Sequence, residues 1–141
     1  VLRDPSASAQ TTPMPGIHDL GSLVENVRAA GLEVTLSTAP DVPELAPAAQ
    51  LAVFRIVQEA LTNTMKHGGP EAHADVTVEP GELGIVARVV STGRAESAAA
   101  PGSGAGIQGM KERAHIHGGS LVAEPTEAGF LVELSLPEDV A

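Results

Sequence analysis

Two pairs of segments with alternating apolar and polar residues constrain the fold of this chain most strongly. The first pair covers residues 74–79 and 83–90, and the second covers 120–123 and 130–136. Alternation with a period of two predicts strands that bury one face and leave the other in water. A short turn at 80–82 joins the first pair, so its strands are expected to pair antiparallel. We therefore expect hairpin-linked strands.

Helical periodicity predicts three helices, over residues 19–30, 48–66 and 107–117, and a further strand at 32–37. The order along the chain is then helix, strand, helix, two strands, helix and two strands. Helices combined with hairpin-linked strands indicate an α+β fold, a two-layer α/β sandwich.

Length and composition limit the number of domains and the class of partner. A chain of 141 residues has the size of one domain, and we expect residues 1–16, rich in Pro, Ser and Thr, to be a linker or disordered tail and 17–138 to form the domain. The net charge of −10 and the presence of only Phe54 and Phe130 as aromatic residues argue against contact with nucleic acid or an anionic membrane. The chain has no cysteine and no apolar run long enough to span a membrane, which fits a cytoplasmic location.

Residues 55–67 predict an amphipathic helix with polar chemistry on one face. Glu59 and Asn63 are four residues apart and share this face, together with Arg55 and Lys66, while His67 lies at the helix end. The opposite face carries apolar residues spaced for burial: Phe54, Val57, Leu61 and Met65. Such a set of polar groups suggests a site for a metal-bound phosphate, although an ordinary surface helix could carry the same residue types.

The residue types on this helix suggest separate roles at such a site. Mg²⁺ prefers oxygen ligands and keeps several waters, so the amide oxygen of Asn63 can suffice beside phosphate oxygens. Glu59, one turn earlier, is placed to polarise a water or hydroxyl or to hold the hydration shell of the metal. Lys66 and His67 would supply positive charge for phosphates.

A second candidate element is the glycine-rich segment 102–110, which leads into the last predicted helix. Glycines let a backbone approach a ligand, and free N–H groups at a helix start attract anions. We expect the donors to be Gly104, Ala105, Gly106 and Ile107. The alternative is a flexible linker that happens to precede a helix. The segment is neither a dinucleotide-binding fingerprint nor a Walker loop.

Together these segments resemble a known family. The stretch from Arg55 to His67 is similar to the N box of sensor histidine kinases, in the subfamily whose response regulators carry helix-turn-helix domains. Gly104-Ala-Gly-Ile-Gln-Gly-Met-Lys-Glu-Arg resembles the second glycine box of that subfamily, and the resemblance covers about residues 15–137. It implies a Bergerat-type ATPase fold: a mixed, largely antiparallel sheet with helices on one face and ATP under a mobile lid at about 94–105.

The resemblance also implies a role for each matching residue. Asn63 would coordinate Mg²⁺, Glu59 would assist the reactive water or the metal, and Lys66 and His67 would face phosphates. Residues 104–107 would hold phosphates. The implied activity is that of an ATP-dependent protein histidine kinase, in which phosphoryl transfer depends mainly on positioning and charge neutralisation.

The chain departs from the family pattern at the residues that would contact the adenine base. The first glycine box of the family usually reads Asp-x-Gly-x-Gly, whereas this chain has Ser91, Gly93 and Ala95 at the corresponding positions. Loss of a charge-assisted hydrogen bond costs roughly 1.5–3 kcal/mol, or about tenfold to a hundredfold in affinity. The Ser91 hydroxyl, or a water, can recover part of this loss. Weak ATP binding is therefore expected, and a complete loss of binding stays open.

The resemblance implies partners as well. The γ-phosphate of Mg-ATP would pass to a His on a separate dimerisation and phosphoacceptor domain and then to a response regulator, so the chain alone would bind nucleotide without phosphorylating itself. We expect the fragment to be monomeric, with no direct contact to nucleic acid or membrane. We also expect it to be cytoplasmic, as part of a sensor that is either soluble or membrane-bound. Two alternatives to a histidine kinase domain are a nucleotide-incompetent interaction module and an anti-sigma-factor serine kinase on the same fold.

Overall fold

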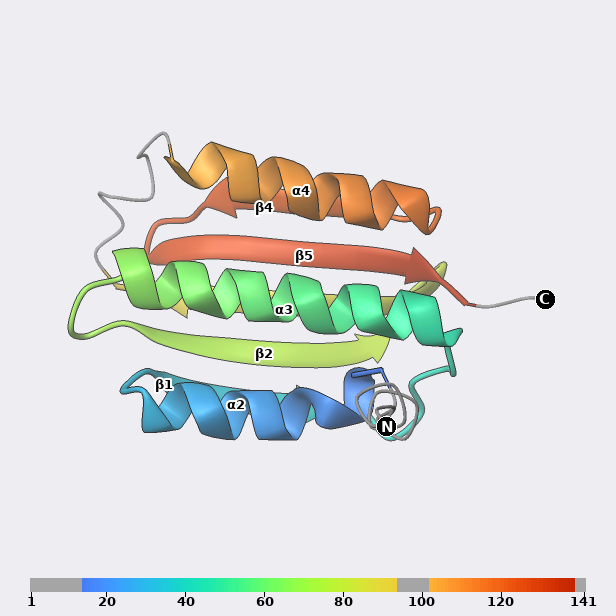
Figure 1. Cartoon of the computed structure of the whole chain (residues 1–141), viewed down its shortest axis with the longest axis horizontal. Helices are drawn as coiled ribbons and strands as arrows, with labels where there is room; N and C mark the ends of the chain where they lie inside the picture. Colours follow the sequence, from blue (N-terminus) through green and yellow to red (C-terminus); the bar gives the residue numbers. More distant parts are fainter. Residues whose placement is uncertain (1–13, 94–101, 139–141) are drawn as a thin grey trace, which may run out of the picture.

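The computed structural model describes residues 14–93 and 102–138. These form a five-stranded sheet with helices on one of its faces, and the strand order is β1-β2-β3-β5-β4 (Figure 1). The strands are β1 Glu33–Thr38, β2 His73–Pro80, β3 Gly84–Thr92, β4 Ser120–Pro125 and β5 Gly129–Pro137. The helices are η1 Ile17–Asp19, α2 Leu20–Ala29, α3 Pro47–His67 and α4 Gly102–Ile116. The predicted two-layer α+β sandwich is confirmed.

The pairing of the strands is mixed but largely antiparallel, as the resemblance implied. β1 pairs parallel with β2, because the chain crosses over through α3 between them, while the pairs β2–β3, β3–β5 and β4–β5 are antiparallel. In the register of β3 with β5, Ser91 lies opposite Phe130 and Thr92 lies opposite Gly129. This pairing brings the carboxyl end of β3 beside the start of β5.

The core lies between the sheet and the three α-helices, with α3 across the middle strands (Figure 1). The buried residues of α3 are Ala52, Val53, Ile56, Val57, Ala60, Leu61 and Thr64. The predicted apolar face is therefore only partly right: Met65 is 41% exposed and Phe54 is half-buried. The physical reason is that the face toward the sheet runs through positions 53, 57, 60 and 64, which places positions 54 and 65 at its sides.

The predicted start of the last helix is wrong by five residues. We expected the helix to begin at Ile107, whereas α4 begins at Gly102. Three glycines in its first five residues have low helix propensity, which is why the sequence favoured a loop there. Met110 and Ala114 of α4 are fully buried, so packing against the sheet and α3 helps to hold this helix in place.

The sheet face that the helices leave uncovered carries an ion-pair network. Nη1 of Arg88 lies 3.2 Å from Oε2 of Glu79, and Nη2 of Arg88 lies 2.6 Å from Oε2 of Glu133. The hydrogen bond to Glu133 is the main reason why the pKa of Arg88 is raised above its ordinary value. The network ties β2, β3 and β5 together. In the described part of the chain, the helices all lack the combination of length and hydropathy needed to cross a membrane.

Candidate functional site

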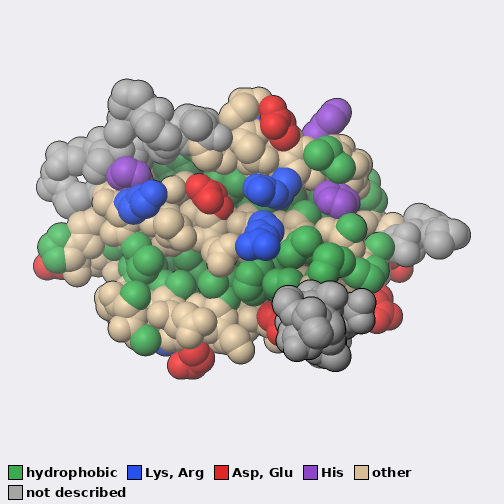
Figure 2. All heavy atoms as spheres, in the orientation of Figure 1, with side chains coloured by type: hydrophobic (Ala, Val, Ile, Leu, Met, Phe, Trp, Pro, Cys, Tyr) green, Lys and Arg blue, Asp and Glu red, His purple; other side chains and the backbone are tan. Residues whose placement is uncertain are grey.

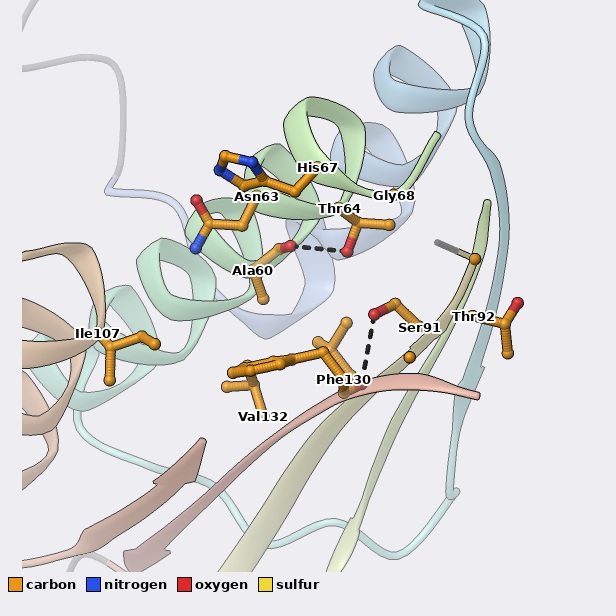
Figure 3. Close-up of a pocket in the computed structure, with 13 residues that line it drawn as sticks. Ala60, Asn63, Thr64, His67, Gly68, Ser91, Thr92, Ile107, Phe130 and Val132 are labelled. Carbon is orange, nitrogen blue, oxygen red and sulfur yellow. Dashed lines mark hydrogen bonds between the residues drawn. The ribbon is translucent and has the colours of Figure 1, made fainter. Parts of the chain in front are cut away.

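A pocket opens between the second half of α3, the end of β3, the start of β5 and α4 (Figure 3). It is lined by Ala60, Asn63, Thr64, His67, Gly68, Val89, Ser91, Thr92, Gly93, Ile107, Gly129, Phe130 and Val132. Four segments that are far apart in the sequence therefore meet at one place. Apolar side chains form much of the lining, and a small number of polar groups stand among them, as is usual for small-molecule sites.

Five of the residues predicted from the sequence lie in this lining. Asn63 and His67 come from successive turns of α3, Ser91 and Gly93 from the end of β3, and Ile107 from α4. In Figure 3 the side chains of Asn63 and His67 lie next to each other on α3, above the Phe130 ring. The fold thus brings residues of the stretch that resembles the N box and of the two glycine-box segments to a single site.

Two of the predicted residues on α3 lie outside the pocket lining. Glu59 is half-buried between α3 and α4, where its carboxylate lies against the backbone of Gly106. Lys66 is exposed near the end of α3. Both lie within one turn of Asn63, so they stand beside the pocket rather than in its wall.

The buried end of the pocket is closed by two hydroxyl groups. Ser91 is 8% exposed, and its hydroxyl donates to the backbone carbonyl of Phe130 at 3.3 Å. The Thr64 hydroxyl donates to the carbonyl of Ala60 at 3.0 Å. Both donors are used within the protein, and the oxygen lone pairs remain able to accept a hydrogen bond. Across residues 14–93 and 106–138, no buried side-chain nitrogen or oxygen atom lacks a partner.

Sequence reasoning missed Thr64, although a signal for it existed. Thr64 occupies a position of α3 that faces the core, at the spacing of Val57 and Leu61, and it is a polar residue next to Asn63. A polar residue on the buried face of a helix needs a local hydrogen bond, and Thr64 bonds to the carbonyl four residues earlier. The polar residue on the buried face is the sequence signal, and the structure places Thr64 in the pocket lining.

Close backbone contacts shape the end of the pocket near β3. Gly93 has φ of +132°, and its N–H donates to the carbonyl of Ala128 at 3.0 Å. A Cβ at Gly129 would clash with the backbone carbonyl of Ser91. Gly129 therefore allows β5 to lie against the end of β3, a role that the sequence alone did not reveal. Gly68, the C-cap residue of α3, also lines the pocket.

The glycine-rich segment lies differently from the prediction. Because α4 begins at Gly102, the N–H groups of Gly106 and Ile107 fall inside the helix. There they can donate hydrogen bonds to the carbonyls four residues earlier. Gly104 and Ala105 are closer to the helix start. Residues 94–101 of the predicted lid lie outside the described residues.

Exposed cations gather on the helix-covered side of the molecule, although the chain as a whole is acidic. Figure 2 shows Lys and Arg side chains over α3 and α4. Arg55 and Lys66 are exposed on α3, and Lys111 and Arg113 on α4. A local excess of positive charge favours an anionic ligand at this side.

Comparison with known proteins gives a consistent result. No protein-family model matches the chain. The sequence is 34% identical over 127 residues to the sensor histidine kinase YxjM of Bacillus subtilis (strain 168), an alignment that covers 88% of the chain and 30% of that kinase. The chain therefore spans about a third of the length of this curated relative.

Solved structures support the same fold. The blue-light activated histidine kinase of Erythrobacter litoralis EL346 superposes with a TM-score of 0.69 at 16% identity, covering 92% of the chain and 43% of that protein. The ATP binding domain of PrrB from Mycobacterium tuberculosis superposes with a TM-score of 0.60 at 22% identity, covering 86% of the chain and 95% of that domain. At these identities the superpositions show a shared fold.

Proposed function

The chain belongs to the catalytic domains of sensor histidine kinases, and from this premise we propose that it binds Mg-ATP in the pocket between α3 and the ends of β3 and β5. It would supply the γ-phosphate to a His on a separate dimerisation and phosphoacceptor domain. The observation that carries this proposal is the convergence of Asn63, His67 and Ser91 from distant segments on one pocket.

The apolar part of the pocket lining suits a flat heteroaromatic base. Ile107, Phe130 and Val132 supply apolar surface, and burial of the base against them would contribute most of the affinity there. The Ser91 hydroxyl, which donates to Phe130, can accept an N–H from the base. A neutral acceptor replaces the carboxylate that the family uses, so we expect the base to be held more weakly.

The open end of the pocket suits phosphates and a metal. Among the described residues, no group of three His, Asp or Glu side chains is arranged to hold a metal ion. Mg²⁺ needs no such cage, because it takes one or two protein oxygens and completes its coordination with phosphate oxygens and waters. The amide oxygen of Asn63 and the carboxylate of Glu59 fit this requirement. When bound, the ion would neutralise phosphate charge.

The remaining phosphate contacts belong to the same proposal. His67 at the pocket and exposed Lys66 beside it would supply positive charge to the β- and γ-phosphates. Residues 104–107 would approach the phosphates from α4. For the N–H groups of Gly106 and Ile107 to take part, the first turns of α4 would have to open.

Partners and location also remain part of the proposal. A response regulator would receive the phosphoryl group from the phosphoacceptor His, and the present chain alone would bind nucleotide as a monomer without phosphorylating itself. We place the domain in the cytoplasm, where ATP and the regulator are available. The relative YxjM is named as a sensor histidine kinase, which supports a phosphoacceptor domain as a partner.

A thermal shift experiment tests the proposal. Mg-ATP at millimolar concentration should raise the melting temperature of the chain, because a ligand that binds only the folded state stabilises it. Tripolyphosphate with Mg²⁺ is the control, since it lacks the base and should give a smaller shift. Equal shifts would show that the pocket does not recognise the base, and no shift with either compound would overturn the proposal.

A further inference from the structure

The face of α4 that meets α3 contains a glycine. Met110 and Ala114 are fully buried, and Gly106 precedes Met110 by four residues, so all three lie on one face of the helix. α3 and α4 pack against each other (Figure 1). Gly106 is therefore the point where the backbone of α4, without a side chain, lies next to α3.

The residue of α3 that meets this point is Glu59. A Cβ at Gly106 would lie 2.8 Å from Oε2 of Glu59 and 3.7 Å from its Cδ. Carbon atoms of this kind essentially never approach another heavy atom within 3.0 Å. The carboxylate thus occupies the space that any side chain at position 106 would need.

From this contact we propose that Gly106 is a positioning residue, which sets the place of the Glu59 carboxylate beside the phosphate end of the pocket. The inference rests on the proposed function, because it assumes that Glu59 acts on the metal-bound phosphates. A side chain at 106 would displace the carboxylate rather than the helices, since the contact involves the flexible end of Glu59. The expected consequence is a change in metal-dependent nucleotide binding with no loss of folding stability.

Gly109 provides a matched control on the same helix. A Cβ at Gly109 would meet no atom within 4 Å. Gly106→Ala and Gly109→Ala each replace a glycine of α4 by the best helix former, so both should keep or raise the melting temperature. The two variants differ in the contact with Glu59, which separates this contact from any general effect of helix stiffness.

Two measurements on the 141-residue chain test the inference. The first is the carboxyl ¹³C resonance of Glu59, assigned with Glu59→Gln, which should move in G106A and stay in place in G109A. The second is ATP affinity measured by calorimetry with and without Mg²⁺. G106A should reduce the gain in affinity that Mg²⁺ provides by about threefold or more, while this gain in G109A stays near that of the unaltered chain.

A second substitution asks whether the position of the carboxylate is the cause. Glu59→Asp shortens the side chain by one methylene, so in the G106A background it should recover part of the Mg²⁺-dependent gain, whereas alone it should reduce that gain. An unmoved Glu59 resonance in G106A, or equal gains in G106A and G109A, would overturn the inference and leave the proposed function standing. Absence of any nucleotide binding by the unaltered chain would overturn both.

Discussion

The two ends of the pocket are built differently. At the buried end, Ser91 and Thr64 are fixed by hydrogen bonds to backbone carbonyls, and neither carries a charge. At the open end, Asn63 and His67 in the wall and Glu59 beside it are half-buried polar groups on successive turns of one helix. The open end keeps the family pattern that the sequence showed, while the buried end departs from it at Ser91. Under the proposed function, recognition of phosphate and recognition of the base would therefore depend on separate groups of this pocket.

This contrast predicts that changes at the two ends have different consequences. A change at the buried end should affect both stability and the base, because the same groups hold the strands together. A change at the open end should affect phosphate and metal binding and leave stability nearly unaltered. The following substitutions test that division.

Gly129→Ala should have the largest effect. The new Cβ would clash with the backbone of Ser91 where β5 meets β3, which neither strand can relieve by rotating a side chain. We expect a loss of about 3 kcal/mol in the free energy of unfolding, measured by urea denaturation. Gly21→Ala, at an exposed position of α2 where a Cβ meets no atom within 4 Å, is the control and should lose no stability. Equal stabilities of the two variants would contradict the tight join between β3 and β5.

Asn63→Ala should be the largest change at the open end. Loss of an amide oxygen from a metal-bound phosphate site costs about 1.5–3 kcal/mol, which corresponds to about tenfold to a hundredfold weaker Mg-ATP binding. The melting temperature without nucleotide should change little, because Asn63 is half-buried and lies outside the core. Asn26→Ala on the exposed side of α2 is the matched control. Unaltered Mg-ATP affinity in N63A would remove Asn63 from the site.

Ser91→Asp should strengthen the base end while weakening the fold. A carboxylate at this position could accept an N–H of adenine more strongly than a hydroxyl, so ATP affinity should rise about tenfold. The free protein should melt at a lower temperature, because a charge would be buried beside the Phe130 carbonyl without a partner.

Ser135→Asp, at a half-buried position of β5 outside the pocket lining, serves as the control for added charge. It should leave ATP affinity as it is. If S91D created binding where the unaltered chain had none, the site would be a degenerate one. If S91D failed to raise the affinity, Ser91 would not face the base.

Arg88→Met should have the smallest effect and none on nucleotide. Arg88 joins Glu79 and Glu133 on the uncovered face, and partly exposed pairs of this kind contribute about 1 kcal/mol, less at high salt. Because the pKa of Arg88 is raised, on the alkaline side the contribution of its charged form is lost only in strong alkali, so the stability difference should not depend on pH near neutrality. Arg55→Met, at an exposed position of α3, is the control for the loss of an arginine side chain. A change in ATP affinity in R88M would contradict the separation of the two sheet faces.

Local patterns predicted the elements of this fold well. The alternating segments became β2, β3, β4 and β5, and the long amphipathic segment became α3, because period and turn chemistry act over a few residues. Asn63, His67, Ser91, Gly93 and Ile107 were predicted for one site and lie around one pocket. Their grouping followed from the family resemblance rather than from spacing alone.

The features that the sequence missed depend on distant contacts. The roles of Gly129 and Phe130 follow from the register of β5 with β3, which no local pattern specifies. The earlier start of α4 depends on packing that overrides the low helix propensity of its glycines. The exposure of Met65 depends on which face of α3 packs on the sheet.

The central claim is that this pocket binds an adenine nucleotide through a neutral base end and a metal-dependent phosphate end. Isothermal titration of the chain with ADP, with and without Mg²⁺, tests it most directly. We predict saturable binding at one site per chain, weaker than is usual for a carboxylate-containing site and tightened by Mg²⁺. Absence of heat at millimolar ADP, or an affinity that Mg²⁺ does not change, would contradict the account.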